Sequence, residues 1–356
     1  MKKAFAIAGL VSVSLLTAAC SESGSGAENG TVGISMPDKS LERWEKDGNN
    51  MVTELEGLGY DVDIQYAQGE TQTQSEQIEN MITKKVDALI IAPVDGSTLS
   101  DPVNLAANQD IPVIAYDRLI MNTENLDYYT TFDLVTVGEI QGQYIVDALD
   151  LDNTDESFNI ELFGGAPDDN NARFFFEGAM NVMQPYMDEG QLVVQSGQVN
   201  FNAVATESWS ASNAQTRMDN LLTGHYSDED IDAVLAQNDA IAQGVVSSLV
   251  SMGYGSDSRP MPIITGQDAE VSSVNSIIDG NQTMTVFKDT TALAKAAASI
   301  VDAILTGEEP EVNDTESFDN NEKVIPTYLL DPIAVDVGNY QEILIDSGYI
   351  DSSDVE

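Results

Sequence analysis

The chain is poor in histidine, cysteine and tryptophan. Its 356 residues include one histidine, one cysteine and two tryptophans. The histidine, His225, has no second histidine or cysteine nearby to complete a zinc ligand set, and a single cysteine cannot form a disulfide within the chain. We therefore expect no metal or other cofactor. The small supply of catalytic side chains also argues against an enzyme.

Basic residues are scarce as well. The sequence has 14 Lys and Arg against 60 Asp and Glu, which gives a formal net charge of −46. A surface of this sign repels nucleic acid and anionic lipid headgroups. We therefore expect no nucleic-acid partner and no attachment to a membrane by charge.

Long apolar runs are absent beyond the start of the chain. Residues 1–20 join two lysines to an apolar stretch and then to small residues, which is the layout of a secretion signal. LLTAAC, which ends this segment, resembles the lipobox of bacterial lipoproteins, in which the cysteine is lipidated. The resemblance implies an extracytoplasmic protein that is held at the bacterial cell membrane by a lipid on Cys20. Residues 21–30 are small and polar, and we expect them to form a flexible tether.

From Thr31 onward, short apolar runs alternate with segments of helical period, and the pattern restarts once. The runs are residues 31–37, 61–67, 88–94 and 111–117 in the first series, and 158–165, 192–198, 233–239, 262–268 and 284–289 in the second. Such alternation predicts a parallel sheet covered by helices on both faces. The sequence thus predicts an α/β protein with two doubly wound parallel-sheet lobes, joined near residues 131–135, and a central cleft.

Polar groups follow five of the predicted strands. They are Asp117 with Arg118, Asp168 to Asn171, Asn238 with Asp239, Gln267 with Asp268, and Lys288 with Asp289. Ligands of such sheets bind beyond the carboxyl ends of the strands, so we expect these groups to meet in the cleft. Helix capping explains part of this pattern, but PDDNN (167–171) has more polar side chains than one cap needs. Asp168 is our candidate for the cap.

This mixture of side chains suits a neutral, polyhydroxylated ligand. Carboxylates accept from neighbouring hydroxyls, amides donate and accept, and Arg or Lys donates to sugar oxygens. A sugar ring also needs a flat apolar surface, and Trp44 and Trp209 both lie at predicted helix starts beside the cleft. Arg43 lies at the same mouth, and one of Phe174 to Phe176 could face inward.

The acid-rich cleft also allows an enzyme hypothesis. A glycosidase needs two carboxylates, and Asp169 with Asp268 could supply them. The Arg, Lys and amide groups around the same cleft argue for holding a sugar rather than cleaving one.

A set of motifs then points to one family. In order along the chain they are LERWEKDGNNM, EQIENMI, YDRLIMNTENLDYYTTFD, NIELFGGAPDDNNARFF, RMDNLL, GQDAEV, TVFKDT and IPTYLLDPIAV. Together they resemble the xylose-binding and multiple-monosaccharide-binding receptors of sugar ABC transporters, which are ribose/galactose-type periplasmic binding proteins. The resemblance covers almost all of residues 31–350.

The resemblance implies the type I periplasmic binding protein fold, in which three crossings link two lobes. The crossings are expected near Thr131 to Asp133, near Gly266 to Asp268 and after Lys288. Residues 31–132 with about 268–287 would form the N-terminal lobe, and residues 133–267 with about 288–356 the C-terminal lobe.

The resemblance also implies a set of sugar contacts. They are Arg43, Trp44, Asp117, Arg118, Asp169, Asn170, Asn171, Asn238, Asp239, Asp268 and Lys288, with Trp209 as a second stacking aromatic. The implied function is that of a monomeric binding protein that takes a monosaccharide of the xylose, arabinose, glucose or galactose class. It would deliver the sugar to an ABC permease driven by a separate ATPase. The alternative is a sensor that reports the sugar to a chemoreceptor or sensor kinase.

Overall fold

The computed structural model describes Met1 and residues 29–355. The expected signal peptide beyond Met1, Cys20 with its lipid, and residues 21–28 of the tether lie outside the described residues. In the part of the chain that is described, no helix combines the length and apolar character needed to cross a membrane.

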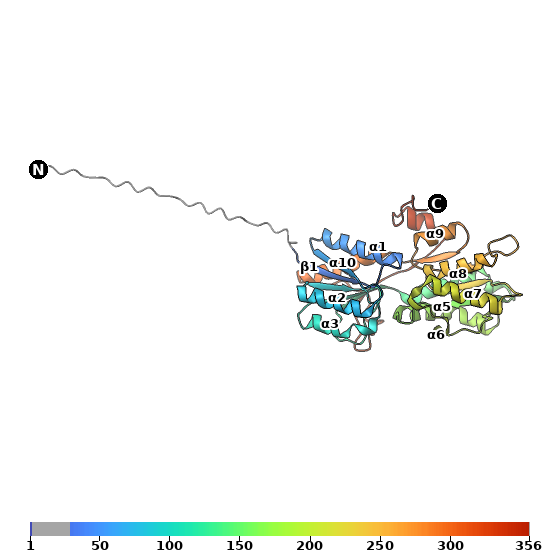
Figure 1. Cartoon of the computed structure of the whole chain (residues 1–356), viewed down its shortest axis with the longest axis horizontal. Helices are drawn as coiled ribbons and strands as arrows, with labels where there is room; N and C mark the ends of the chain where they lie inside the picture. The colour runs from blue at the N-terminus through green and yellow to red at the C-terminus, as the bar shows by residue number, and fades with distance from the viewer. Residues whose placement is uncertain (2–28, 356) are drawn as a thin grey trace.

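The first lobe is a six-stranded parallel sheet with helices on both faces (Figure 1). Its strand order is β11-β5-β4-β3-β1-β2, and every neighbouring pair is parallel. The strands are β1 (Thr31–Met36), β2 (Asp61–Tyr66), β3 (Ala88–Ile91), β4 (Val113–Tyr116), β5 (Tyr128–Phe132) and β11 (Thr327–Leu330). The helices are α1 (Glu42–Gly57), α2 (Thr71–Lys84), α3 (Ser100–Ala107) and α10 (Thr290–Thr306), with a 3-10 turn η1 (Gly96–Thr98) before α3.

The central strands of this sheet are buried along their whole length, because helices cover both faces. In β3, Leu89 and Ile91 pack in the cluster that holds α2 and α3, whereas Ile90 packs with α1 and α10. Successive side chains of a strand point to opposite faces of the sheet, so β3 supplies apolar side chains to both faces.

The second lobe contains a four-stranded parallel sheet in the order β7-β6-β8-β9 and an antiparallel pair, β10 and β12. The strands are β6 (Phe158–Phe163), β7 (Leu192–Val193), β8 (Ala233–Ala236), β9 (Ile263–Ile264), β10 (Met284–Phe287) and β12 (Ile333–Asp336). The helices are α4 (Leu134–Ala148), α5 (Asn170–Asp188), α6 (Phe201–Val204), α7 (Ala211–His225), α8 (Asp239–Ser251) and α9 (Val271–Ile278). Short helical turns are η2 (Leu151–Asn153), η3 (Glu207–Trp209) and η4 (Gln341–Ile345).

Helix α5, which carries part of the site, is fixed by close packing on α4. A Cβ atom added at Gly178 would lie 2.0 Å from the carbonyl oxygen of Val135, and one at Gly138 would lie 1.9 Å from that of Phe175. Only glycine allows the two backbones to approach this closely. The start of α5 is therefore held rigidly against the rest of its lobe.

Strand pairing corrects the expected path of the chain after residue 267. We expected residues 268–287 in the first lobe and 288–356 in the second. Instead β10 pairs with β12 and is joined by a parallel bridge from Val286 to Gln267 of the second lobe, whereas α10 packs on α1 and β11 pairs with β5. The chain thus returns to the first lobe at Lys288 and leaves it again after Leu330. Gly266 to Asp268 is not a crossing.

Candidate functional site

A small cavity, in which the centre of a water molecule can occupy about 20 Å³, lies between the lobes. Its lining contains every implied sugar contact except Asn170 and Asp239. The expected residues that line it are Arg43, Trp44, Asp117, Arg118, Asp169, Asn171, Trp209, Asn238, Asp268 and Lys288. Leu41, Phe175 and Gln267 also line it.

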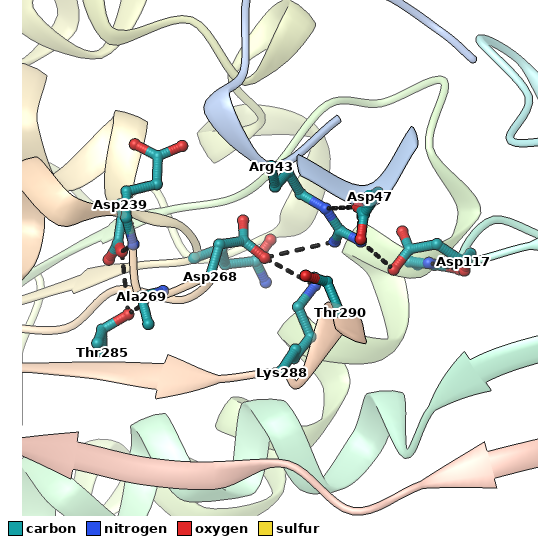
Figure 2. Close-up of polar contacts among 12 residues, drawn as sticks. Arg43, Asp47, Asp117, Asp239, Asp268, Ala269, Thr285, Lys288 and Thr290 are labelled. Carbon is teal, nitrogen blue, oxygen red and sulfur yellow. Dashed lines mark hydrogen bonds and ion pairs between the residues drawn. The ribbon is translucent and has the colours of Figure 1, made fainter. Parts of the chain in front are cut away.

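Helix α1 places Arg43 in the centre of a buried charge network (Figure 2). The Arg43 guanidinium donates to Asp47 at 2.8 and 3.0 Å, to Asp117 at 2.9 Å and to Asp268 at 3.4 Å. Burial lowers the pKa of Arg43, but the nearby carboxylates of Asp117 and Asp47 outweigh burial and leave the pKa well above its ordinary value. The cation is therefore permanent, and the carboxylates around it orient it.

Asp47 is the member of this network that sequence reasoning missed. It lies one helical turn after Arg43, is fully buried, and accepts from the hydroxyl of Tyr116 at 2.9 Å. Burial raises the pKa of Asp47 to about 6, against the opposing effect of Arg43. The i,i+4 spacing from Arg43 was the available signal for this pair.

The loop after β4 places Asp117 and Arg118 at the cavity. Asp117 has a left-handed backbone (φ 61°), and its carbonyl oxygen accepts from the hydroxyls of Tyr129 and Thr131. Burial raises the pKa of the Asp117 carboxyl, but Arg43 and other cations more than offset this effect and hold it below its ordinary value. The left-handed backbone of Asp117 is a strained conformation. Backbone strain is common at binding sites, where the surrounding contacts hold the residue in place.

Arg118 links the two lobes. Its Nε lies 2.9 Å from Oδ2 of Asp169 in the second lobe, and its Nη1 donates to the carbonyl oxygens of Pro93 and Val94. A second link joins the lobes beside it, because Nδ2 of Asn171 donates to the carbonyl oxygen of Asp117 at 2.7 Å.

The start of α5 supplies the second-lobe side of the cavity. Asp169, and not Asp168 as we expected, caps the helix: its Oδ1 accepts from the backbone N–H of Asn171 at 3.0 Å. Its Oδ2 also accepts from the indole N–H of Trp209 at 3.2 Å. Burial raises the pKa of Asp169, and Arg118 offsets only part of this increase. One carboxylate therefore caps the helix and faces the cavity at the same time.

Asn170 does not line the cavity. Successive side chains point about 100° apart around a helix, so the first turn of α5 directs Asn171 inward and leaves Asn170 half-exposed. By the same periodicity Phe175, one turn after Asn171, is the phenylalanine of the FFF run that lines the cavity.

Three aromatic side chains form the apolar part of the lining. Trp44, Phe175 and Trp209 are each at most 5% exposed. Phe175 and Trp209 meet edge to face with centroids 6.3 Å apart, and the guanidinium of Arg43 lies 4.4 Å from the Trp44 ring centroid. The flat surfaces are thus held next to the charged groups, as recognition of a sugar ring requires.

Segments near the lobe connections complete the site. Oδ1 of Asp268 accepts from Nζ of Lys288 at 2.9 Å as well as from Arg43 (Figure 2). Asn238 caps α8 through its Oδ1 and the backbone N–H of Ile241. Asp268 has a positive φ of 97°.

Asp239 lies behind the cavity instead of lining it. As the first residue of α8 it turns away from the lining residue Asn238. Its carboxylate accepts from the backbone N–H of Glu270, from Gln282 and from the hydroxyl of Thr285. Thr285 also accepts from the backbone N–H of Ala269, so Asp239 fixes the segment that presents Asp268.

Two properties of the lining indicate the kind of ligand that fits. Three carboxylates (Asp117, Asp169, Asp268) face three cations (Arg43, Arg118, Lys288), so the charges that line the cavity balance. Oδ1 of Asn171 and Oε1 of Gln267 are buried and have no hydrogen-bond partner among the described residues. Buried acceptors of this kind need a donor, and ligand hydroxyl groups would supply it.

The described residues offer no metal centre. Within residues 29–355, no group of three or more His, Cys, Asp and Glu side chains is arranged to hold a metal ion. His225, at the end of α7, lies outside the cavity lining.

Comparison with known proteins decides the family. The family described as "Periplasmic binding protein domain" matches residues 32–309. The chain belongs to the periplasmic binding protein family. This confirms the resemblance that its motifs predicted.

Known relatives are similar in sequence to this chain over most of its length. It is 54% identical to the multiple sugar-binding periplasmic protein SbpA of Azospirillum brasilense, over 90% of this chain and 89% of the relative. It is 39% identical to the D-xylose-binding periplasmic protein of Escherichia coli strain K12, over 91% of this chain and 92% of the relative.

One similar solved structure is an ABC transporter solute-binding protein of Clostridium phytofermentans with bound β-D-glucose. Its sequence is 47% identical, the TM-score is 0.88, and the match covers 92% of this chain and 100% of that one. The predicted α/β fold with two parallel-sheet lobes is confirmed. Because these relatives are binding proteins, the expectation of a binding protein rather than an enzyme is confirmed as well.

Proposed function

We propose that this periplasmic binding protein takes a monosaccharide of the xylose, arabinose, glucose or galactose class into the cavity between its lobes. The observation that carries the proposal is the lining: balanced charges, unsatisfied amide oxygens and three aromatic side chains around one small cavity. The relative named as a multiple sugar-binding protein and the solved structure with bound β-D-glucose support the same ligand class.

The lining residues divide into two roles. Charged and amide groups donate to and accept from the sugar hydroxyls, with charge-assisted bonds from Arg43, Asp117 and Asp268 among the stronger contacts. Trp44, Trp209 and Phe175 cover the apolar C–H surface of the ring. We leave Asn170 and Asp239 out of the proposed contacts because neither lines the cavity.

Binding would favour the closed arrangement of the lobes. A ligand shifts such an equilibrium only through contacts that it makes more strongly in one state. A sugar in this cavity contacts Arg118 of the first lobe and Asp169 of the second together, and separation of the lobes would break one of these contacts.

Calorimetric titration of the purified protein tests the proposal directly. We expect D-xylose, L-arabinose, D-glucose or D-galactose to bind with micromolar or tighter affinity and to change tryptophan fluorescence. If none of the four sugars binds at micromolar concentration, the proposed ligand class is wrong.

We also infer that the protein is a lipoprotein that serves an ABC permease with a separate ATPase. The LLTAAC segment supports the anchor on Cys20, and the solved relative described as an ABC transporter solute-binding protein supports the transport role. In the native host, Cys20→Ser should release the protein from the membrane fraction, and deletion of the protein should abolish uptake of its sugar. Uptake that persists while a sugar-dependent signal is lost would instead favour delivery to a chemoreceptor or sensor kinase.

A further inference from the structure

A second, larger space lies directly outside the cavity. It is a groove, open to solvent, in which the centre of a water molecule can occupy about 420 Å³. Leu41, Arg118 and Trp209 line both the cavity and the groove, so the two spaces adjoin. These three side chains form the boundary between the cavity and the groove.

The groove has a buried apolar floor and an exposed polar rim. Its floor includes Pro37, Val94, Ala166 and Trp209, all of which are buried. The exposed residues of its rim include Gln68, Glu70, Asp168 and Ser208. Both lobes contribute, because Gln68 and Glu70 follow β2 and the other two rim residues belong to the second lobe.

We propose that this groove is a subsite for a second sugar unit, so that the protein binds disaccharides whose terminal unit occupies the cavity. The inference rests on the proposed monosaccharide site. An apolar floor covers the C–H face of a pyranose ring, while rim carboxylates and amides accept from and donate to its hydroxyls. Because the walls come from both lobes, a second unit here would also favour the closed arrangement.

The charges of the groove favour a neutral substituent over a phosphate or a carboxylate. Asp38, Glu70 and Asp168 line the groove, and they would repel an anion. Nζ of Lys39 is paired with Glu45 at 3.0 Å, and Arg118 is paired with Asp169. A glycosyl unit, which is neutral and rich in hydroxyls, fits these groups.

The test compares a monosaccharide with its disaccharides on the same protein. Calorimetry is run with D-glucose and with disaccharides in which glucose is joined to a second glucose through O1, O3, O4 or O6. We expect at least one of these disaccharides to bind within tenfold of D-glucose. If D-glucose binds and none of the disaccharides does, the subsite is refuted while the monosaccharide site stands. If neither kind binds, both proposals fail for glucose.

A pair of variants locates the second unit. Glu70 is exposed at the start of α2, and its side chain makes no capping bond, so Glu70→Trp can fill the groove without loss of a structural contact. We expect it to weaken disaccharide binding at least tenfold and to leave D-glucose binding within twofold, which also shows that the variant is folded. Glu79→Trp, on an exposed position of the same helix away from the groove, should change neither affinity. Equal disaccharide binding by the wild type and Glu70→Trp would overturn the proposal.

Discussion

The two sides of the cavity are built differently. On the first-lobe side, Arg43 is held by Asp47 and Asp117, which belong to the same lobe. On the second-lobe side, Asp169 and Asn171 direct their polar atoms across the cleft, to Arg118 and to the carbonyl oxygen of Asp117. When the lobes separate, Arg43 keeps its bonds to Asp47 and Asp117 and loses the longer contact to Asp268, whereas Asp169 and Asn171 lose Arg118 and the carbonyl oxygen of Asp117. One side is preorganised for the ligand, and the other completes the site on closure.

Removal of Arg43 should have the largest effect, because it breaks the preorganised side. Arg43→Met leaves Asp47 and Asp117 buried without their cation, and loss of one partner of a buried pair costs about 3–5 kcal/mol. We expect the free energy of unfolding to fall by this amount and sugar binding to fall at least a hundredfold. Urea unfolding and calorimetry measure the two effects.

Lys39→Met is the matched control for this change. Lys39 pairs with Glu45 at the surface, where the lysine side chain is 48% exposed, and such pairs are worth less than about 1 kcal/mol. If the two variants lose similar stability, the Arg43 network is not the preorganised element that we describe.

A change on the second-lobe side should reduce binding more than stability. Asp169→Asn keeps an oxygen that can cap α5, and asparagine is as good a cap as aspartate. The substitution also removes a buried charge whose pKa burial has already raised. We expect less than about 1 kcal/mol of lost stability but a loss of binding of roughly 2–3 kcal/mol, because a charged hydrogen bond to the sugar disappears. Asp168→Asn, on the exposed neighbour, should leave monosaccharide affinity within twofold.

Much of this site could be predicted from strand ends. Asp117, Asp169 and Asn238 follow parallel strands, β4 in the first lobe and β6 and β8 in the second, and the rule for such sheets places ligand contacts beyond the carboxyl ends of the strands. The same rule placed Asn170 and Asp239 in the cavity, and both predictions were wrong. The rule locates the turn after a strand, whereas the rotation of the first helical residues decides which side chain faces inward.

Hydrophobic periodicity could not predict which lobe each segment after residue 267 joins. Helix α10 has an apolar face of small residues such as Ala294 and Ala297, and this face shows only that it covers a sheet. The choice of sheet comes from its fit against Trp44, Met51 and Leu55 of α1, which are far away in sequence. Tertiary packing of this kind leaves no local pattern in the sequence.

Asn171 and Asn170 offer a smaller and more local comparison. Asn171 donates across the cleft and has a buried Oδ1 without a partner among the described residues, so Asn171→Ala should weaken sugar binding about tenfold, or about 1.4 kcal/mol. Asn170→Ala, on the next residue of α5, should change binding less than twofold. Calorimetry on the two variants checks this, and equal losses would mean that the helix start is rotated from the arrangement described.

The smallest expected effect concerns the segment behind Asp268, where buried carboxylates lack the cations that balance the cavity. Burial, followed by the charge of Asp268, raises the pKa of Glu270 from 4.5 to about 8. Between these values the folded protein holds more protons than the unfolded chain, so the free energy of unfolding should fall as the pH rises through this window. Glu270→Gln removes this group and should flatten the dependence of the free energy of unfolding on pH between 5 and 8, which urea unfolding at several pH values measures. An unchanged pH profile would show that the hydrogen bond from Gln243 and local solvent already stabilise the Glu270 carboxylate. The negative charge of this segment would then be compensated as fully as that of the Arg43 network.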